Sequence, residues 1–344
     1  MTAASVTGSM PPSPAAPAVL EVNDLSVRFH PRGRGVVHAV SGLSYSVPSG
    51  RTVAIIGESG SGKTASSRAI MGLLPRSAQV SGSARLAGTE LIGLGPRSLR
   101  RHRGRDVAMI FQDPARSLNP TMEVGPQIAE AIRAHNKVSR SEARERAIEL
   151  FKLVRLSAPE QRYSEYPHQF SGGMRQRVMI AMALALSPRL LIADEPTTAL
   201  DVTVQAQIMQ LLTRLQSEEG MFLVLITHDL GVVADVADRV VLMYAGRVVE
   251  TGPLREVYEH SAHPYTSGLM ASVPALDGPR DRLIPIQGSP PDLLSLPSGC
   301  SFRPRCQYAD AVCADVEPDL RQLSGRPTHR AACHHPEGAL THAH

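Results

Sequence analysis

The most constraining feature of the sequence is the run GESGSGKT at residues 57–64, which fits the pattern G-x-x-x-x-G-K-[ST] without a gap. The apolar stretch 52–56 before it predicts a strand, and 65–74 after it predicts a helix. Glycines let successive backbone N–H groups face inward, and the N-terminus of the helix adds its positive end. In this context the run predicts a phosphate-binding loop rather than a chance glycine-rich turn.

The last two residues of the loop carry its most specific chemistry. We expect the Lys63 ammonium to reach the β- and γ-phosphates and the Thr64 hydroxyl to bind Mg²⁺. The loop residues that we expect to cradle the nucleotide are Gly57, Ser59, Gly60, Ser61 and Gly62.

Two further strands are predicted to end in reactive side chains. Asp194 and Glu195 follow the apolar run 190–193, and His228 follows the run 222–226. Ligands bind at the carboxyl ends of strands in open α/β sheets, and neighbouring strand residues point to opposite sides. We therefore assign Asp194 to Mg²⁺, Glu195 to the attacking water and His228 to the γ-phosphate. The plainer alternatives are a capped strand end and a structural histidine.

Two weaker signals are consistent with a nucleotide site. Phe29 ends a predicted strand over 19–29, where its ring could stack on a base or simply pack against the protein. Ser171, Gly172 and Gly173 open a predicted helix and leave its first N–H groups unobstructed, which favours a second anion site. The same tripeptide also occurs in ordinary turns.

Composition narrows the class of protein. The 344 residues are 42% hydrophobic and 20% charged, with a net charge of +4, which is typical of a globular chain of about two domains. We find no apolar run of about 18 residues and no secretory signal, and expect a cytosolic chain with reduced cysteines. The arginine-rich stretch 97–105 is more typical of a solvated face than of a nucleic-acid site, so no nucleic-acid partner is expected.

Together these motifs resemble those of the ATPase subunits of ABC transporters. The resemblance identifies 57–64 as Walker A, Gln112 as the Q-loop residue, 170–174 (FSGGM) as the signature, 199–201 as the D-loop and His228 as the switch histidine. It implies an α/β fold, a P-loop NTPase (RecA-like) core with an antiparallel β subdomain, a helical insertion and a small cysteine-containing tail. It also makes Glu195 the catalytic carboxylate, with Lys63 and His228 beside it.

The resemblance extends to domain boundaries. We expect a disordered leader over 1–18, an ABC nucleotide-binding domain over 19–262 with its helical insertion at about 113–170, and a C-terminal extension over 263–344. Prolines and glycines over 274–298 predict a linker into a separate tail.

Several segments are similar to the dipeptide/oligopeptide import branch of the family. They are FQDP at 111–114, SLNP at 117–120, YPHQF at 166–170 and GSPP at 288–291. That branch also includes importers of nickel and glutathione, which stay open as alternatives. A non-transport ABC ATPase is the other alternative, but the chain lacks the long coiled coil or second cassette of such proteins.

The resemblance also implies a mechanism and partners. Two ATPase domains close head to tail around ATP and Mg²⁺; Gln112 joins Thr64 and Asp194 at the metal, and Ser171 with its glycines serves the partner's ATP. The implied partners are two transmembrane permease subunits, a second ATP-binding subunit, for which a paralogue is favoured, and an extracytoplasmic solute-binding protein. The chain would then lie peripherally on the cytoplasmic face of the membrane.

The cysteines are clustered in the extension, at Cys300, Cys306, Cys313 and Cys333. Their spacing matches no common zinc-finger or ferredoxin pattern, and it leaves iron–sulfur, zinc and no metal open. The segment also has few large apolar residues with which to build a core of its own. The resemblance to related importers implies a 4Fe-4S cluster with a structural role at these positions.

Overall fold

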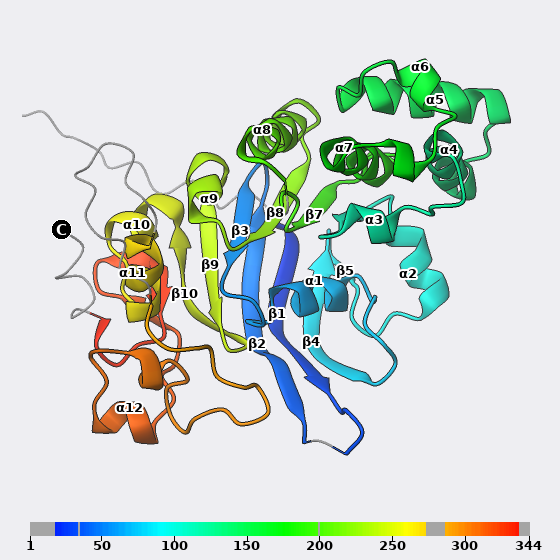
Figure 1. Cartoon of the computed structure of the whole chain (residues 1–344). Helices are drawn as coiled ribbons and strands as arrows, with labels where there is room; N and C mark the ends of the chain where they lie inside the picture. Colours follow the sequence, from blue (N-terminus) through cyan, green and yellow to red (C-terminus); the bar gives the residue numbers. More distant parts are fainter. Residues whose placement is uncertain (1–17, 34, 199, 273–285, 337–344) are drawn as a thin grey trace, which may run out of the picture.

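The computed structural model describes residues 18–33, 35–198, 200–272 and 286–336, which form two β-sheets with helices around them (Figure 1). The predicted leader therefore lies outside the described residues, apart from Ala18, which begins a strand. Within the described ranges, every helix is too short or too polar to cross a bilayer.

The larger sheet has eight strands in the order β11-β12-β10-β9-β3-β8-β7-β6. Its central strands are parallel and almost fully buried, as expected for a sheet covered on both faces. Their carboxyl ends consequently share one edge. The parallel strands are β3 (Thr52–Ile56), β6 (Val107–Ile110), β7 (Leu190–Asp194), β8 (Phe222–Thr227) and β9 (Arg239–Tyr244).

The smaller sheet is antiparallel, with the order β2-β1-β4-β5. Its apolar residues share one core cluster with helix α1 (Lys63–Ile70) and strand β3, which places it beside the phosphate-binding loop. The sequence did not predict β4 and β5, because their residues are mostly small and polar and alternate weakly. The strands are β1 (Ala18–Phe29), β2 (Val37–Pro48), β4 (Ala78–Leu86) and β5 (Thr89–Glu90).

The segment between 113 and 170 contains only helical elements and turns. Ile128, Phe151 and Val178 belong to a single buried cluster that joins α4, α5 and α7, drawn in green at the upper right of Figure 1. The helices from residue 96 to residue 183, of which α3 to η1 lie between 113 and 170, are α2 (Pro96–His102), α3 (Pro114–Ser117), α4 (Val124–His135), α5 (Arg140–Leu153), α6 (Pro159–Arg162), η1 (Pro167–Gln169) and α7 (Gly172–Ala183).

The C-terminal extension is not the separate tail that its composition predicted. Strand β12 (Arg326–Ala331) pairs antiparallel with β10 (Arg247–Pro253), so the extension adds β12 and β11 (Arg321–Leu323) to the main sheet. The expected linker falls partly on 273–285, which lie outside the described residues. The remaining helices are α8 (Val202–Glu218), α9 (Leu230–Val236), α10 (Leu254–Glu259), α11 (Pro264–Ala271), η2 (Arg303–Arg305) and α12 (Ala311–Asp315).

Candidate functional site

The phosphate-binding loop connects β3 to α1, and its backbone path requires glycine at two positions. Gly62 caps α1 with a φ of 99°, and a Cβ there would lie 2.2 Å from the Ala39 carbonyl oxygen. A Cβ on Gly57 would lie 2.2 Å from the Met243 carbonyl oxygen. The loop is therefore pressed against the neighbouring backbone, which leaves its inner side free for a ligand.

Lys63 is buried within the loop that it is expected to serve. Its ammonium donates to the carbonyl oxygens of Gly57 at 2.6 Å and Glu58 at 2.9 Å. Burial lowers the pKa of Lys63, while the carboxylates of Glu195, Asp194 and Glu58 act in the opposite direction. The ammonium is thus held by weak, neutral acceptors that an anionic ligand can replace.

Asp194 lies at the end of β7, where its carboxylate meets the start of α1. The Thr64 hydroxyl donates to Asp194 Oδ1 at 2.9 Å. Asp194 is fully buried, its Oδ2 has no hydrogen-bond partner, and burial raises its pKa. A buried carboxylate oxygen without a partner is costly, so this pair of oxygen ligands fits a divalent cation bound to phosphate.

Glu195 is the centre of a second polar cluster at the same edge. Gln112 Nε2 donates to Glu195 Oε2 at 2.8 Å, and the Thr198 hydroxyl donates to the same oxygen at 2.9 Å. His228 Nδ1 lies 3.4 Å from Glu195 Oε1. Glu195 also has a φ of 48°, a left-handed conformation that is strained for a side chain of this size. Three strand ends thereby bring Gln112, Glu195 and His228 together.

The remaining predicted residues lie outside this cluster. Phe29 is half-buried at the end of β1 and packs against the core beneath the smaller sheet. Ser171 caps α7 by accepting from the Met174 N–H at 3.3 Å, and a Cβ on Gly173 would lie 2.7 Å from Val204. Among the described residues, Ser171, Gly172 and Gly173 form no hydrogen bond with the clusters around Asp194 and Glu195.

Two residues at the site were not predicted. Thr198 is three residues beyond Glu195, in a turn whose geometry the sequence does not encode as a motif. Glu58 occupies a variable position of the loop pattern, yet its side chain is bound by Arg305 from far along the chain. A contact over that sequence distance leaves no local signal. Ala199 of the expected D-loop lies outside the described residues.

Two family models match this chain. Residues 40–198 match "ABC transporter", and residues 249–313 match "Oligopeptide/dipeptide transporter, C-terminal region". The oligopeptide transport ATP-binding protein OppD of Salmonella typhimurium is 49% identical over 314 residues, which are 91% of this chain and 93% of that protein. The chain belongs to the ABC transporter ATP-binding proteins of the OppD/DppD type.

Other members of the OppD/DppD type differ in length. OppD of Mycobacterium bovis is 51% identical over 92% of this chain but only 51% of its own length, so the chain spans about half of that relative. The dipeptide transport protein DppD of Haemophilus influenzae is 48% identical over 93% of this chain and 96% of that protein.

A solved structure supports the P-loop core predicted for this OppD/DppD-type chain. It is a dimeric, post-hydrolysis state of an ATP-binding cassette with ADP and Pi bound. That cassette is 29% identical, with a TM-score of 0.62 over 69% of this chain and 99% of its own. The expected α/β fold with an antiparallel subdomain is confirmed.

The predicted 4Fe-4S cluster is contradicted for this OppD/DppD-type chain. The matching families and relatives are described as ABC ATP-binding proteins, and none of those descriptions is of an iron–sulfur protein. The four cysteines have free thiols and line one small cavity. Burial raises the pKa of the thiols of Cys300, Cys306 and Cys333, the last to about 11. In the described residues, the group of at least three donors whose ligand atoms all lie within 4.8 Å of one another is mixed, consisting of Asp310, Cys313 and His335.

The predicted cluster was expected because a short extension with few apolar residues cannot fold alone, but this extension does not fold alone. Phe302 of the extension belongs to the same buried cluster as Tyr244 and residues of β3 and β9, and the half-buried Ile286 and Leu296 pack against that cluster. The extension therefore shares the core of the main sheet, and the shortage of apolar residues does not call for a metal.

Proposed function

We propose that this chain is the ATP-hydrolysing subunit of an ABC importer for peptides. Support for transport comes from the two family matches and from relatives named as oligopeptide and dipeptide transport ATP-binding proteins. The observation that carries the proposal is the convergence of the loop, Thr64–Asp194 and the Glu195 cluster at one sheet edge.

ATP binding would proceed by exchange of partners at Lys63. Its ammonium leaves the carbonyls of Gly57 and Glu58 for the phosphate oxygens, which are stronger acceptors because they are charged. The backbone N–H groups of the loop and the N-terminus of α1 add further positive potential. Thr64, Asp194 and Gln112 would hold Mg²⁺, which neutralises charge on the phosphates when it is bound.

Hydrolysis would depend on Glu195. Its carboxylate accepts a hydrogen bond from the attacking water, directs the water in line with the γ-phosphate and takes up its proton. Gln112 and Thr198 donate to Oε2 and thereby fix the rotation of the carboxylate, leaving Oε1 toward His228. His228 would donate to the γ-phosphate. Catalysis here rests on position and charge rather than on a covalent intermediate.

Ser171, Gly172 and Gly173 would act on the ATP of a second ATP-binding subunit. Support comes from their place at the start of α7, away from this chain's own loop cluster, and from the dimeric state of the similar cassette. A γ-phosphate bound between two helix N-termini would stabilise the closed pair of ATP-binding subunits, and hydrolysis would remove that link. Replacement of Ser171 would then slow ATP hydrolysis in the assembled transporter without changing the ATP affinity of the isolated chain.

The assembly would contain two permease subunits, a second ATP-binding subunit, which we take to be a paralogue, and an extracytoplasmic solute-binding protein. The chain would lie on the cytoplasmic face of the membrane. Gln112 lies two residues before α3, so changes at Glu195 can reach the surface around 117–120. That surface would contact the permease subunits and transmit the change at the nucleotide site to them.

The test is uptake by the complete transporter in vesicles, with ATP and Mg²⁺ on the side of the ATP-binding subunits. We expect ATP-dependent uptake of a labelled tripeptide, and no uptake when Lys63→Met is present. ATP hydrolysis accompanied by uptake of nickel ions or glutathione, but of no α-linked peptide, would overturn the peptide assignment and keep the ATPase assignment.

A further inference from the structure

A buried ion pair joins the C-terminal extension to the phosphate-binding loop. Arg305 Nη1 donates to Glu58 Oε2 at 2.7 Å, and Nη2 donates to Oε1 at 3.0 Å. The Arg305 side chain is 5% exposed and that of Glu58 is 25% exposed. A two-point contact of this kind fixes both the distance and the orientation of the carboxylate.

The extension also holds the backbone of Glu58. The Glu58 N–H donates to the hydroxyl of Tyr265 at 2.9 Å, and Tyr265 belongs to α11. The Glu58 carbonyl accepts from Lys63. The second residue of the loop is therefore held at its N–H and its carboxylate by the extension, and at its carbonyl by the lysine that we expect to bind phosphate.

An aromatic cluster makes this attachment rigid. The Phe302 ring packs against the Tyr244 and Tyr265 rings, with centroids 5.2 Å and 5.6 Å apart. The Arg305 guanidinium lies 5.7 Å from the Tyr244 ring centroid and 5.9 Å from that of Phe302. Arg305 Nε also donates to the Gln287 carbonyl at 2.9 Å. The guanidinium consequently has little freedom to follow a moving loop.

We propose that Arg305 is a positioning residue for ATP, through which the C-terminal extension sets the nucleotide affinity of the loop. Arg305 neutralises the Glu58 carboxylate beside the place that the phosphates would occupy and holds the second residue of the loop in position. The inference rests on the ATP site proposed above.

The charge of Glu58 gives the proposal its distinctive consequence. Lys63 donates to the Glu58 carbonyl at 2.9 Å, and the Glu58 carboxylate acts to raise the pKa of Lys63, so this carboxylate lies within electrostatic reach of the phosphate position. Without Arg305 that carboxylate would repel an incoming triphosphate and attract Lys63 away from it. Removing the carboxylate as well should then restore much of the lost affinity, which loss of packing alone would not allow.

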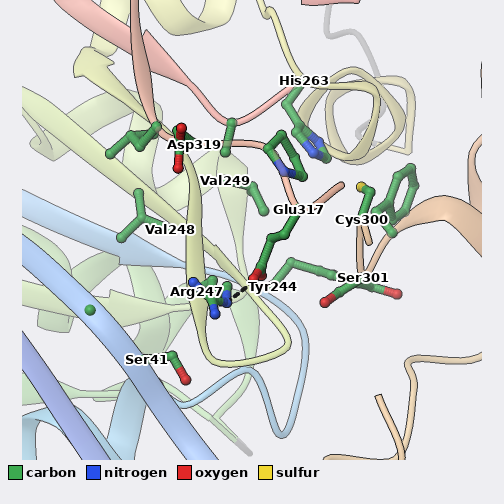
Figure 2. A pocket seen from close by; sticks show the side chains of 15 residues that line it. Ser41, Tyr244, Arg247, Val248, Val249, His263, Cys300, Ser301, Glu317 and Asp319 are labelled. Atoms are coloured by element: carbon green, nitrogen blue, oxygen red, sulfur yellow. Dashed lines mark ion pairs between the residues drawn. The ribbon is translucent and has the colours of Figure 1, made fainter. Parts of the chain in front are cut away.

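A second ion pair between the extension and the main sheet provides a matched control. Arg247 of β10 pairs with Glu317 across the pocket drawn in Figure 2, where a dashed line joins the two side chains. Both side chains are more than a third exposed, and the pocket that they line contains no residue of the phosphate-binding loop. Arg247→Met breaks a link of the same type between the same two parts of the chain, without touching Glu58.

The experiment measures the ATP dissociation constant and the turnover rate of the purified full chain for the wild type and five variants, one of which is Lys63→Met. Arg305→Met should raise the dissociation constant about tenfold, as breaking a buried charge pair is expensive. The dissociation constant of Arg305→Lys should lie between those of the wild type and Arg305→Met, because lysine keeps the positive charge but cannot make the two-point contact of the guanidinium. Glu58→Gln/Arg305→Met should return to within about threefold of the wild type. Arg247→Met should bind as the wild type does.

The outcomes separate this inference from the proposed ATP site. If the wild type binds ATP and Lys63→Met binds it at least about tenfold more weakly, the site stands. Within that result, an unchanged dissociation constant for Arg305→Met overturns the inference. A loss that Glu58→Gln fails to restore, in a variant whose circular dichroism matches the wild type, also overturns it, because the effect is then not the charge of Glu58. The repulsion should weaken in high salt, so the Arg305→Met defect should shrink there.

Discussion

Two carboxylates of the main sheet, Asp194 and Glu250, are equally buried but differ in how many of their oxygens accept hydrogen bonds. Asp194 at the nucleotide edge has one partner, the Thr64 hydroxyl, and leaves Oδ2 unpaired. Glu250 at the junction with the extension accepts from the N–H groups of Ala262 and His263 and from His329 Nε2. An incomplete set of partners marks a place for a ligand, whereas a complete set holds the fold together.

Of the variants at these two carboxylates, Glu250→Ala should affect stability most, and we expect it to lower the free energy of unfolding by about 3–5 kcal/mol. The change leaves three buried donors without an acceptor and loosens β12 from β10. Denaturant unfolding measures the loss. Glu317→Ala removes the exposed partner of Arg247 at the same junction and should cost at most about 1 kcal/mol. Equal losses in the two variants would argue against the distinction.

At the nucleotide edge, Lys63→Met should lower ATP affinity and leave stability almost unchanged. We expect ATP affinity to fall about 10–100-fold, since a hydrogen bond to a charged group contributes about 1.5–3 kcal/mol. Unfolding should change little, because in the described residues the ammonium bonds to neutral acceptors of its own loop, two carbonyl oxygens and, at 3.5 Å, the Ser61 hydroxyl oxygen. Isothermal titration with ATP measures the affinity, and Lys152→Met, at an exposed lysine on α5, is the control. Unaltered affinity in Lys63→Met would remove Lys63 from the site.

A smaller effect should follow from His263, which is buried at the junction and caps α11 by accepting from the Tyr265 N–H. Burial lowers the pKa of His263 to about 3, while the unfolded chain takes up the proton near 6.5. Below pH 6.5 the unfolded state therefore binds more protons, and stability is lost as the pH falls toward 3. Between pH 7.5 and 5.5 the wild type should lose about 1.4 kcal/mol more than His263→Asn in urea unfolding. Identical pH slopes in both proteins would refute this account of His263.

The smallest effect concerns the helical region, away from both carboxylates. Ser139 caps α5 by accepting from the Glu142 N–H, and Glu142 accepts in return from the Ser139 N–H. Ser139→Ala should cost about 1 kcal/mol of stability and leave ATP affinity unchanged. Ser141→Ala on the same turn is the control, and denaturant unfolding is the measurement. A change in ATP affinity would show that the cap reaches the nucleotide edge.

The sequence predicted the nucleotide edge well and the junction poorly, for a physical reason. The strand 52–56, the loop 57–64 and the turn after Asp194 are local patterns, in which spacing alone fixes which groups share an edge. The places of Glu195 and His228 at the same sheet edge were predicted for the same reason, and these two side chains lie 3.4 Å apart. By contrast, the Arg305–Glu58 and His329–Glu250 pairs join residues far apart in the sequence, and neither has a period or a motif.

The most direct test of the account is the ATP turnover of Glu195→Gln, measured together with its ATP affinity in the assembled transporter. Loss of the positioned carboxylate should lower turnover by about 10²–10⁴ while ATP still binds, because Lys63, Thr64 and Asp194 remain. Glu149→Gln, at an exposed acid on α5, should hydrolyse ATP at the wild-type rate. Near-normal turnover by Glu195→Gln would contradict the claim that this edge of the sheet is the catalytic site.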